Sequence, residues 1–114
     1  SLIKEPKESM FLAFAKLEVK NADDYMELQK EIYLPKLEED EGIISYGAFK
    51  VDEENIVLFE FWDSHDAKHD FDEKLNSEEN IYEKFMPLMN GFDDYYGKPY
   101  ALKQFVDFKA GNTI

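Results

Sequence analysis

The chain has 114 residues, of which 44% are hydrophobic and 16% aromatic, so it is long enough for one packed domain and too apolar to be disordered. Its formal net charge is −13, and all 13 basic residues are lysines, which disfavours binding to nucleic acid or to an acidic membrane surface. The absence of cysteine excludes disulfides and thiolate chemistry.

The sequence also lacks arginine, whose planar fork grips phosphates and carboxylates with two hydrogen bonds. It contains no glycine-rich phosphate-binding loop. We therefore expect no flavin or nicotinamide cofactor. Because the sequence has neither a long apolar run nor the apolar core of a signal peptide, it predicts no membrane span and a cytoplasmic location.

A single domain is expected at residues 10–108, between a polar leader at 1–9 and a tail at 109–114. Runs of apolar and aromatic residues predict four strands, at residues 10–19, 43–51, 56–62 and 100–108. A short polar turn joins the second strand to the third as a hairpin. The turn-forming residues at 90–99 predict a loop before the last strand.

Apolar residues at helical spacing predict three helices, at about residues 21–41, 64–75 and 81–89. Asn21 and Ser64 suit the N-cap positions of the first and second helices, because their side-chain oxygens can accept from a free backbone amide. Pro35 predicts a kink or break near Leu34. Gly42 follows an acidic run and is expected at the C′ position that ends the first helix.

The order strand, helix, strand, strand, helix, strand predicts an α+β, ferredoxin-like βαββαβ antiparallel sheet with its helices on one face. The first and third strands are apolar on both faces, and helices on one side cover only one of them. If the second face were exposed, it would form an apolar patch larger than soluble monomers usually carry. We therefore expect a homodimer joined through this face of the sheet. Ile56 and Leu58 are candidates for the partner-facing side. Cover by the long loop or a terminus is the alternative.

Three stretches carry a resemblance to a known family. At residues 40–46, acidic residues and a glycine precede a strand that leads to an aromatic residue. Residues 60–64 read Glu-x-Trp-x-Ser, and Ala67 follows on the next helix. Residues 77–89 resemble the segment that comes after this motif and helix in the family. In these features the chain resembles the antibiotic biosynthesis monooxygenase group of dimeric α/β-barrel proteins over nearly its whole length.

The resemblance implies a dimeric α/β barrel and a cofactor-independent monooxygenase of small aromatic or quinol-like substrates. In such enzymes the substrate itself reduces oxygen, and the protein supplies a dry cavity and a proton-transfer group. Where the family often has histidine, nine residues after the tryptophan, this chain has Phe71. Two alternatives remain: a non-catalytic dimer that binds or senses a small molecule, and a silent dimer that acts through its acidic surface.

Glu60 and Trp62 are the candidate catalytic residues. Glu60 would act as a proton acceptor with a raised pKa, and the Trp62 indole N–H would donate to a ligand oxygen. Aromatic side chains would line an apolar cavity between sheet and helices and bind the substrate, namely Phe14, Tyr46 and Phe71. The structural alternatives are a salt bridge between Glu60 and Lys16 and plain core packing of the aromatic residues.

His65 and His69 precede Glu73 at four-residue steps on the second helix. Helical geometry places both histidines nearly opposite Ala67 and Phe71, which predicts a pair of solvated side chains. A surface metal stripe is the alternative, since imidazole and carboxylate groups bind zinc. We expect no catalytic metal, because nothing at such a surface excludes water.

Overall fold

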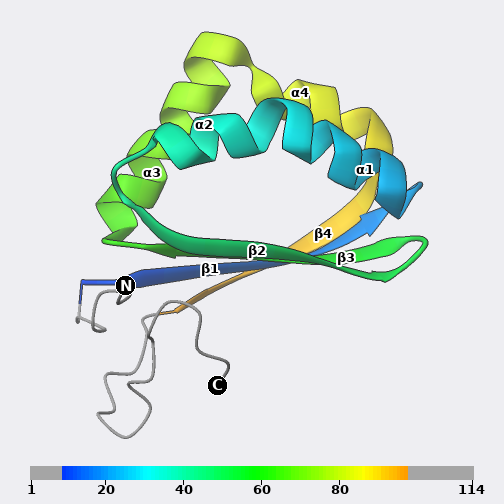
Figure 1. Ribbon diagram of the computed structural model, residues 1–114, viewed down its shortest axis with the longest axis horizontal. Helices are drawn as coiled ribbons and strands as arrows, with labels where there is room; N and C mark the ends of the chain where they lie inside the picture. The colour runs from blue at the N-terminus through cyan, green and yellow to red at the C-terminus, as the bar shows by residue number, and fades with distance from the viewer. Residues whose placement is uncertain (1–8, 98–114) are drawn as a thin grey trace, which may run out of the picture.

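The computed structural model describes residues 9–97. A four-stranded antiparallel sheet forms one layer, and the helices form a second layer on one of its faces (Figure 1). The strand predicted at residues 100–108, the tail and most of the leader lie outside the described residues. None of the helices described is long and apolar enough to cross a membrane.

The sheet contains strands β1 (Phe11–Val19), β2 (Ile43–Asp52), β3 (Asn55–Trp62) and β4 (Met89–Gly97). Their spatial order is β2-β3-β1-β4, and all neighbours run antiparallel. β2 and β3 form the predicted hairpin, and the two halves of the chain interleave in the middle of the sheet. This arrangement is the ferredoxin-like α+β fold that the order of elements predicts.

The fourth strand occupies a stretch that the sequence predicts as a loop, so that prediction is wrong for residues 90–97. The segment pairs with β1 from Leu12, opposite Gly97, to Val19, opposite Met89. Its glycines and acidic residues disfavour a strand locally, but β4 lies at an edge of the sheet, where such residues are tolerated. The segment forms a strand because it pairs with the edge of β1 that β3 leaves unpaired.

The helical layer comprises α1 (Ala22–Leu28), the π-helical turn η1 (Gln29–Tyr33), α2 (Leu34–Glu39), α3 (His65–Lys74), the π-helical turn η2 (Leu75–Glu79), α4 (Ile81–Phe85) and the 3₁₀ turn η3 (Met86–Leu88). Both predicted N-caps are confirmed: Oδ1 of Asn21 accepts from the amide of Asp24 at 3.0 Å, and Oγ of Ser64 accepts from the amide of Ala67 at 3.1 Å.

Pro35 interrupts the first helix where predicted. The amide of Leu34 donates to the carbonyl of Gln29, five residues back, and the α-helix resumes with Pro35 in its first turn. A proline in a regular helix would clash with the carbonyl four residues earlier, and the wider turn relieves that clash. As a result Gln29 and Tyr33, at the two ends of η1, are both buried.

The end of this helix differs from the expectation for Gly42. The helix ends at Glu39, and Asp40 has an extended backbone, with its side chain accepting from the Gly42 amide at 2.8 Å. Gly42 does not adopt the left-handed conformation, so the predicted C′ role is wrong. A left-handed residue occurs instead at Asn80, with φ of 49°, and separates η2 from α4.

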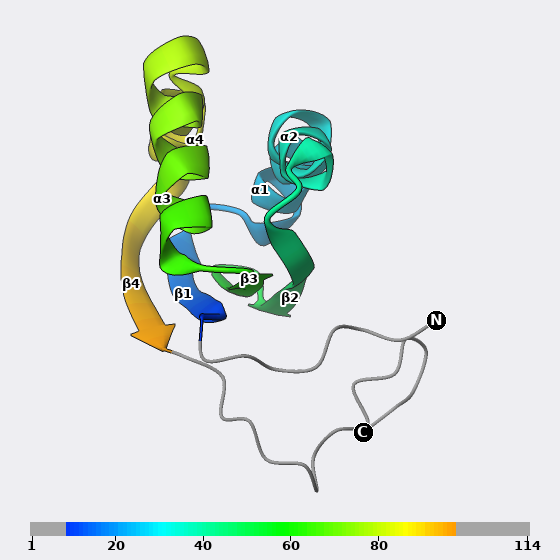
Figure 2. The same cartoon turned by 90° about the vertical axis from the view of Figure 1, so that its left-hand side faces the viewer.

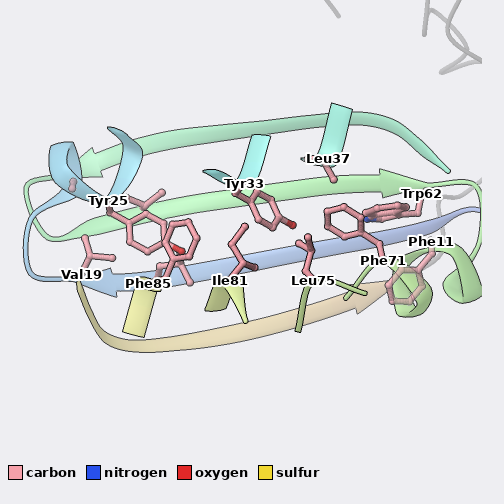
Figure 3. Packing of buried hydrophobic residues seen from close by; sticks show 13 residues of the cluster. Phe11, Val19, Tyr25, Tyr33, Leu37, Trp62, Phe71, Leu75, Ile81 and Phe85 are labelled. Carbon is pink, nitrogen blue, oxygen red and sulfur yellow. The ribbon is translucent and has the colours of Figure 1, made fainter. Parts of the chain in front are cut away.

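The core lies between the sheet and the helices. Tyr25 and Phe85 pack at one end with ring centroids 5.1 Å apart, and Trp62 and Phe71 pack at the other end at the same distance (Figure 3). Viewed end-on, the helices form two rows on one side of the sheet, with α1 and α2 toward β2 and with α3 and α4 toward β4 (Figure 2).

The other face of the sheet carries apolar residues of its own. Ile56 is fully buried and Leu58 packs against the same core, so both residues face the helices. The expectation that they face a partner subunit is therefore wrong. The alternating residues Val57 and Phe59 point the other way, and Phe14 on β1 lies directly opposite Phe59. In the described part of the chain, no helix covers this face (Figure 2).

Candidate active site

A pocket of about 480 Å³ lies between the sheet and α3. Ala13 and Ala15 of β1 contribute to its floor, and their small side chains leave the space open. Its polar lining comes from several elements and includes Tyr33, Glu60, Lys68, Asp72, Tyr82 and Asp94. The pocket therefore has ionisable as well as apolar and aromatic lining, so the purely apolar and aromatic lining predicted from the sequence holds only in part.

Glu60 is the buried carboxylate of this pocket. It faces the helices because it lies two residues after Leu58 on β3, and every second side chain of a strand points to the same face. Its oxygens accept hydrogen bonds from the Tyr33 hydroxyl at 2.5 Å and from the Trp62 indole N–H at 2.9 Å. Nζ of Lys68 lies 3.3 Å from Oε1. Lys16 is exposed and points to the other face, so the predicted Lys16–Glu60 salt bridge is wrong.

Lys68 is the cation that compensates this charge. Its side chain is 14% exposed, and its ammonium group lies 2.9 Å from Asp72 as well as 3.3 Å from Glu60. Burial by itself lowers the pKa of Lys68, but the two carboxylates outweigh that effect and raise the pKa above its ordinary value. Lys68 is therefore charged at neutral pH, and one of its three N–H groups remains for a ligand.

Two tyrosines complete the cluster, which we define as Tyr33, Glu60, Lys68, Asp72 and Tyr82. The Tyr82 hydroxyl donates to Asp72 at 2.8 Å. Burial, followed by the nearby carboxylates, raises the pKa of both tyrosines. They are thus proton donors rather than phenolates at neutral pH. With two carboxylates against one ammonium, the cluster favours a neutral ligand with donor groups over an anion.

The predicted site residues do not gather in one place. Trp62 is fully buried, and its N–H is already bonded to Glu60; it packs on Phe71 outside the pocket. Phe14 is part of the lining, although its strand position belongs to the sheet face that none of the described helices covers. We call this face, which carries Phe14, Val57 and Phe59, the open sheet face. Tyr46 lines a second, smaller pocket of about 210 Å³, and its hydroxyl donates to Glu38.

Sequence reasoning missed Lys68, Asp72, Tyr33 and Tyr82. The four-residue spacing of Lys68 and Asp72 on one helix is a signal for an ion pair, but exposed helices carry many such pairs. Which lysine meets Glu60 depends on the face of the sheet that the helix covers, and periodicity alone leaves that face open.

Both histidine side chains are exposed as predicted, but His69 also lines the pocket between the sheet and α3, where the sequence predicted no histidine. His69 lies 3.1 Å from Glu73, and His65 packs on the edge of Phe11 with ring centroids 4.9 Å apart. Within the described chain, no group of three potential ligands is arranged to hold a metal ion.

Solved structures share this fold. A point mutant of SnoaB, a cofactor-independent oxygenase from Streptomyces nogalater, matches with a TM-score of 0.71 at 9% identity, over 83% of this chain and 97% of that chain. A "putative antibiotic biosynthesis monooxygenase" from Chloroflexus aurantiacus matches with a TM-score of 0.65 at 21% identity, over 81% of this chain and 94% of that one.

A dimeric ferredoxin-like protein from an uncultured marine organism matches with a TM-score of 0.66 at 16% identity, over 83% of this chain and 91% of the other. No family model matches the sequence, and no curated protein does either. At these identities the likeness shows the fold alone. The chain thus has the ferredoxin-like fold of antibiotic biosynthesis monooxygenase-type proteins, which confirms the expected resemblance at that level.

Proposed function

We propose that this protein is a cofactor-independent monooxygenase of small, neutral, hydroxylated aromatic or quinol-like substrates. The observation that carries the proposal is the buried cluster around Glu60 and Lys68 in a pocket large enough for a fused-ring substrate. A solved cofactor-independent oxygenase with the same fold supports the reaction class.

The chemistry balances without an added reductant. When a phenol takes up one O₂ and becomes a quinone, one oxygen atom forms the new carbonyl and the other leaves as water. The substrate supplies all four electrons, its ring C–H and O–H hydrogens end up in the water, and the net reaction needs no other reagent. The protein then has to orient the substrate, accept a proton and exclude water.

The cluster is suited to these tasks. A carboxylate offers about four lone-pair sites, and three donors occupy sites on Glu60, which leaves one for a substrate hydroxyl. The remaining N–H of Lys68 would stabilise the negative charge that develops when that hydroxyl loses its proton. Trp62 would act as a positioning residue, because its N–H orients Glu60 rather than touching the substrate.

We also propose that the protein is a homodimer joined through the open sheet face. Phe49 on this face is 59% exposed, and Phe59 stacks on it with ring centroids 6.1 Å apart. A second copy of the face would cover these rings from water. The dimeric protein of the same fold supports this arrangement. The cytoplasmic location stays a prediction from the sequence.

A non-catalytic dimer that binds or senses a small molecule is the second candidate. The observation in its favour is that Glu60 is already paired with three donors. A carboxylate held in this way serves as a structural anchor unless a substrate hydroxyl reaches its remaining site.

Oxygen uptake separates the two candidates. An oxygen electrode would follow wild type with a panel of naphthols, naphthalenediols and simple quinols, each corrected for its uncatalysed rate. The monooxygenase proposal expects uptake with at least one substrate and its loss in Glu60→Gln. The matched control is Asp66→Asn at the exposed start of α3, which should retain full uptake. Tight binding of a panel member without uptake would favour the binding protein.

A further inference from the structure

The smaller pocket, of about 210 Å³, lies beneath the helical row of α1, η1 and α2 and above β2 and β3. We call it the Gln29 pocket. Its lining is mostly apolar, and the residues used below are Met26, Gln29, Leu37, Tyr46 and Ala48. Tyr33 and Glu60 line both pockets, so their hydrogen bond stands between the two spaces.

Gln29 is the unusual residue of this pocket. It is 6% exposed, yet within the described chain its side-chain amide has no hydrogen-bond partner. No fully enclosed side-chain nitrogen or oxygen among residues 9–97 lacks a partner, so the Gln29 amide must still reach open space. Gln29 lines the pocket, so a ligand bound there comes within reach of its side chain. Water in that space can bond the amide, and a ligand that offers the same hydrogen bonds can displace this water.

The backbone explains how the amide comes to lie there. Gln29 begins the π-helical turn that Pro35 makes necessary, and Tyr33 ends it. The wide turn brings both side chains to the inner side of the row, where Gln29 meets the Gln29 pocket and Tyr33 meets Glu60. π-Helical turns inside α-helices occur frequently at functional sites. This turn positions Gln29 in the lining of the pocket.

We propose that the Gln29 pocket is a second binding site, for a neutral one- or two-ring compound that carries a carbonyl beside an N–H or O–H group. The Gln29 amide offers one acceptor and two donors, so it can pair with such a carbonyl and its neighbouring donor at the same time. The apolar walls from Met26, Leu37 and Ala48 contact the rings. An apolar cavity of about 150 Å³ is known to hold benzene, and this pocket is larger.

The charge of the surroundings restricts the ligand to a neutral compound. Glu60 is the only ionisable carboxylate that lines the described pocket, and it is paired with Lys68. The Tyr46 hydroxyl is engaged by Glu38. No cation lines this pocket among the described residues, so an anionic ligand would find no partner there. The inference stands apart from the proposed monooxygenase, whose substrate occupies the larger pocket.

The bicyclic lactam 2-quinolone is the probe, and quinoline, which keeps the rings but has neither the carbonyl nor the N–H, is its matched control. Titration calorimetry on the full chain should give 2-quinolone about tenfold tighter binding than quinoline, as expected for the added hydrogen bonds. In ¹H–¹⁵N spectra of wild type, the side-chain amide signals of Gln29 should shift on addition of 2-quinolone.

Three variants locate the site. Gln29→Leu keeps the volume and should remove the preference for 2-quinolone over quinoline. Ala48→Leu fills the Gln29 pocket and should abolish binding of both compounds. Ala13→Leu fills the larger pocket and should leave both affinities unchanged. Circular dichroism and thermal unfolding verify that each variant is folded.

The proposal is overturned if wild type binds no 2-quinolone at millimolar concentration, or if the Gln29 amide signals stay unchanged when it does bind. It is equally overturned if Gln29→Leu retains the preference, or if Ala13→Leu rather than Ala48→Leu abolishes binding. The wild-type spectra need no variant, so the test holds even if a substitution prevents folding. Oxygen uptake in the larger pocket is a separate measurement, so either proposal can fail alone.

Discussion

The backbone of Gly42 packs directly against Ala67: a β-carbon placed on the glycine would lie 2.7 Å from the β-carbon of the alanine. The amide of Asp63 also donates to the Gly42 carbonyl at 2.8 Å. Residues from two of the stretches that resemble the monooxygenase family therefore meet at the corner between β3 and α3. This contact sets how closely α3 approaches the sheet, and Lys68, the residue after Ala67, is thereby held at Glu60.

Gly42→Ala should destabilise the protein, because the added methyl group forces α3 away from β2. We expect a loss of about 1–3 kcal/mol in the free energy of unfolding, measured by urea denaturation. Gly97→Ala is the matched control, since a β-carbon at Gly97 has no neighbour within 4 Å in the described structure. Equal stability of the two variants would mean that the corner is not closely packed.

Lys68→Met should leave Glu60 and Asp72 facing each other without a cation. The loss of a partner from a buried ion pair is expected to lower the free energy of unfolding by about 3 kcal/mol at pH 7. Lys74→Met, at an exposed position of the same helix, should change it by no more than about 0.5 kcal/mol. If both variants unfold at the same urea concentration, the cluster contributes no stability.

Stability should fall at alkaline pH. Burial raises the pKa of Tyr33 and Tyr82 above the ordinary value of 10.0, and the carboxylates raise it further. Above pH 10.0 the unfolded chain loses tyrosine protons that the folded chain keeps, so the free energy of unfolding decreases as pH rises. Lys68, with its raised pKa, adds a loss of the same sign above its ordinary value of 10.5.

Urea denaturation between pH 7 and 11.5 measures this decline. In Tyr82→Phe the slope above pH 10 should be shallower by about 1.4 kcal/mol per pH unit, the contribution of one proton. A slope identical to that of wild type would show that Tyr82 ionises equally well in the folded and unfolded states.

The proposed dimer interface on the open sheet face can be tested by a substitution at Phe49. Because Phe49 is 59% exposed in one chain, Phe49→Lys should cost the folded monomer little and should dissociate the homodimer by placing charge in its interface. Met86, which is 67% exposed in η3, provides the control variant Met86→Lys and should remain dimeric. Sedimentation equilibrium distinguishes the two species, and a wild type of 13.5 kDa at micromolar concentration would contradict the dimer.

Local chemistry was sufficient for much of the fold. Caps such as Asn21 and Ser64 and the break at Pro35 depend only on neighbours in the chain, and sequence rules predicted them. The role of Gly42 depends on a helix that is distant in sequence, and β4 is a strand because β1 lies beside it. Such contacts between separate segments leave no local signature.

The candidate site was predictable only in part for the same reason. Glu60 stands out as a carboxylate within an apolar strand, and it is indeed buried in the pocket wall. Its partners Tyr33 and Lys68 come from helices on opposite sides of the pocket, and no spacing in the sequence connects them to β3. The Trp62 indole N–H was predicted to donate to a ligand oxygen, whereas in the structure it donates to Glu60 from within the core.

The most direct measurement of the proposed chemistry is isotope incorporation from ¹⁸O₂. Wild type and Glu60→Gln would each be incubated with 1-naphthol under ¹⁸O₂, and the products analysed by mass spectrometry before their carbonyls exchange with water. Wild type should form a naphthoquinone with one labelled oxygen faster than it forms without protein, and Glu60→Gln should not. An unlabelled product, hydrogen peroxide in place of water, or equal formation by the variant would contradict the proposed chemistry.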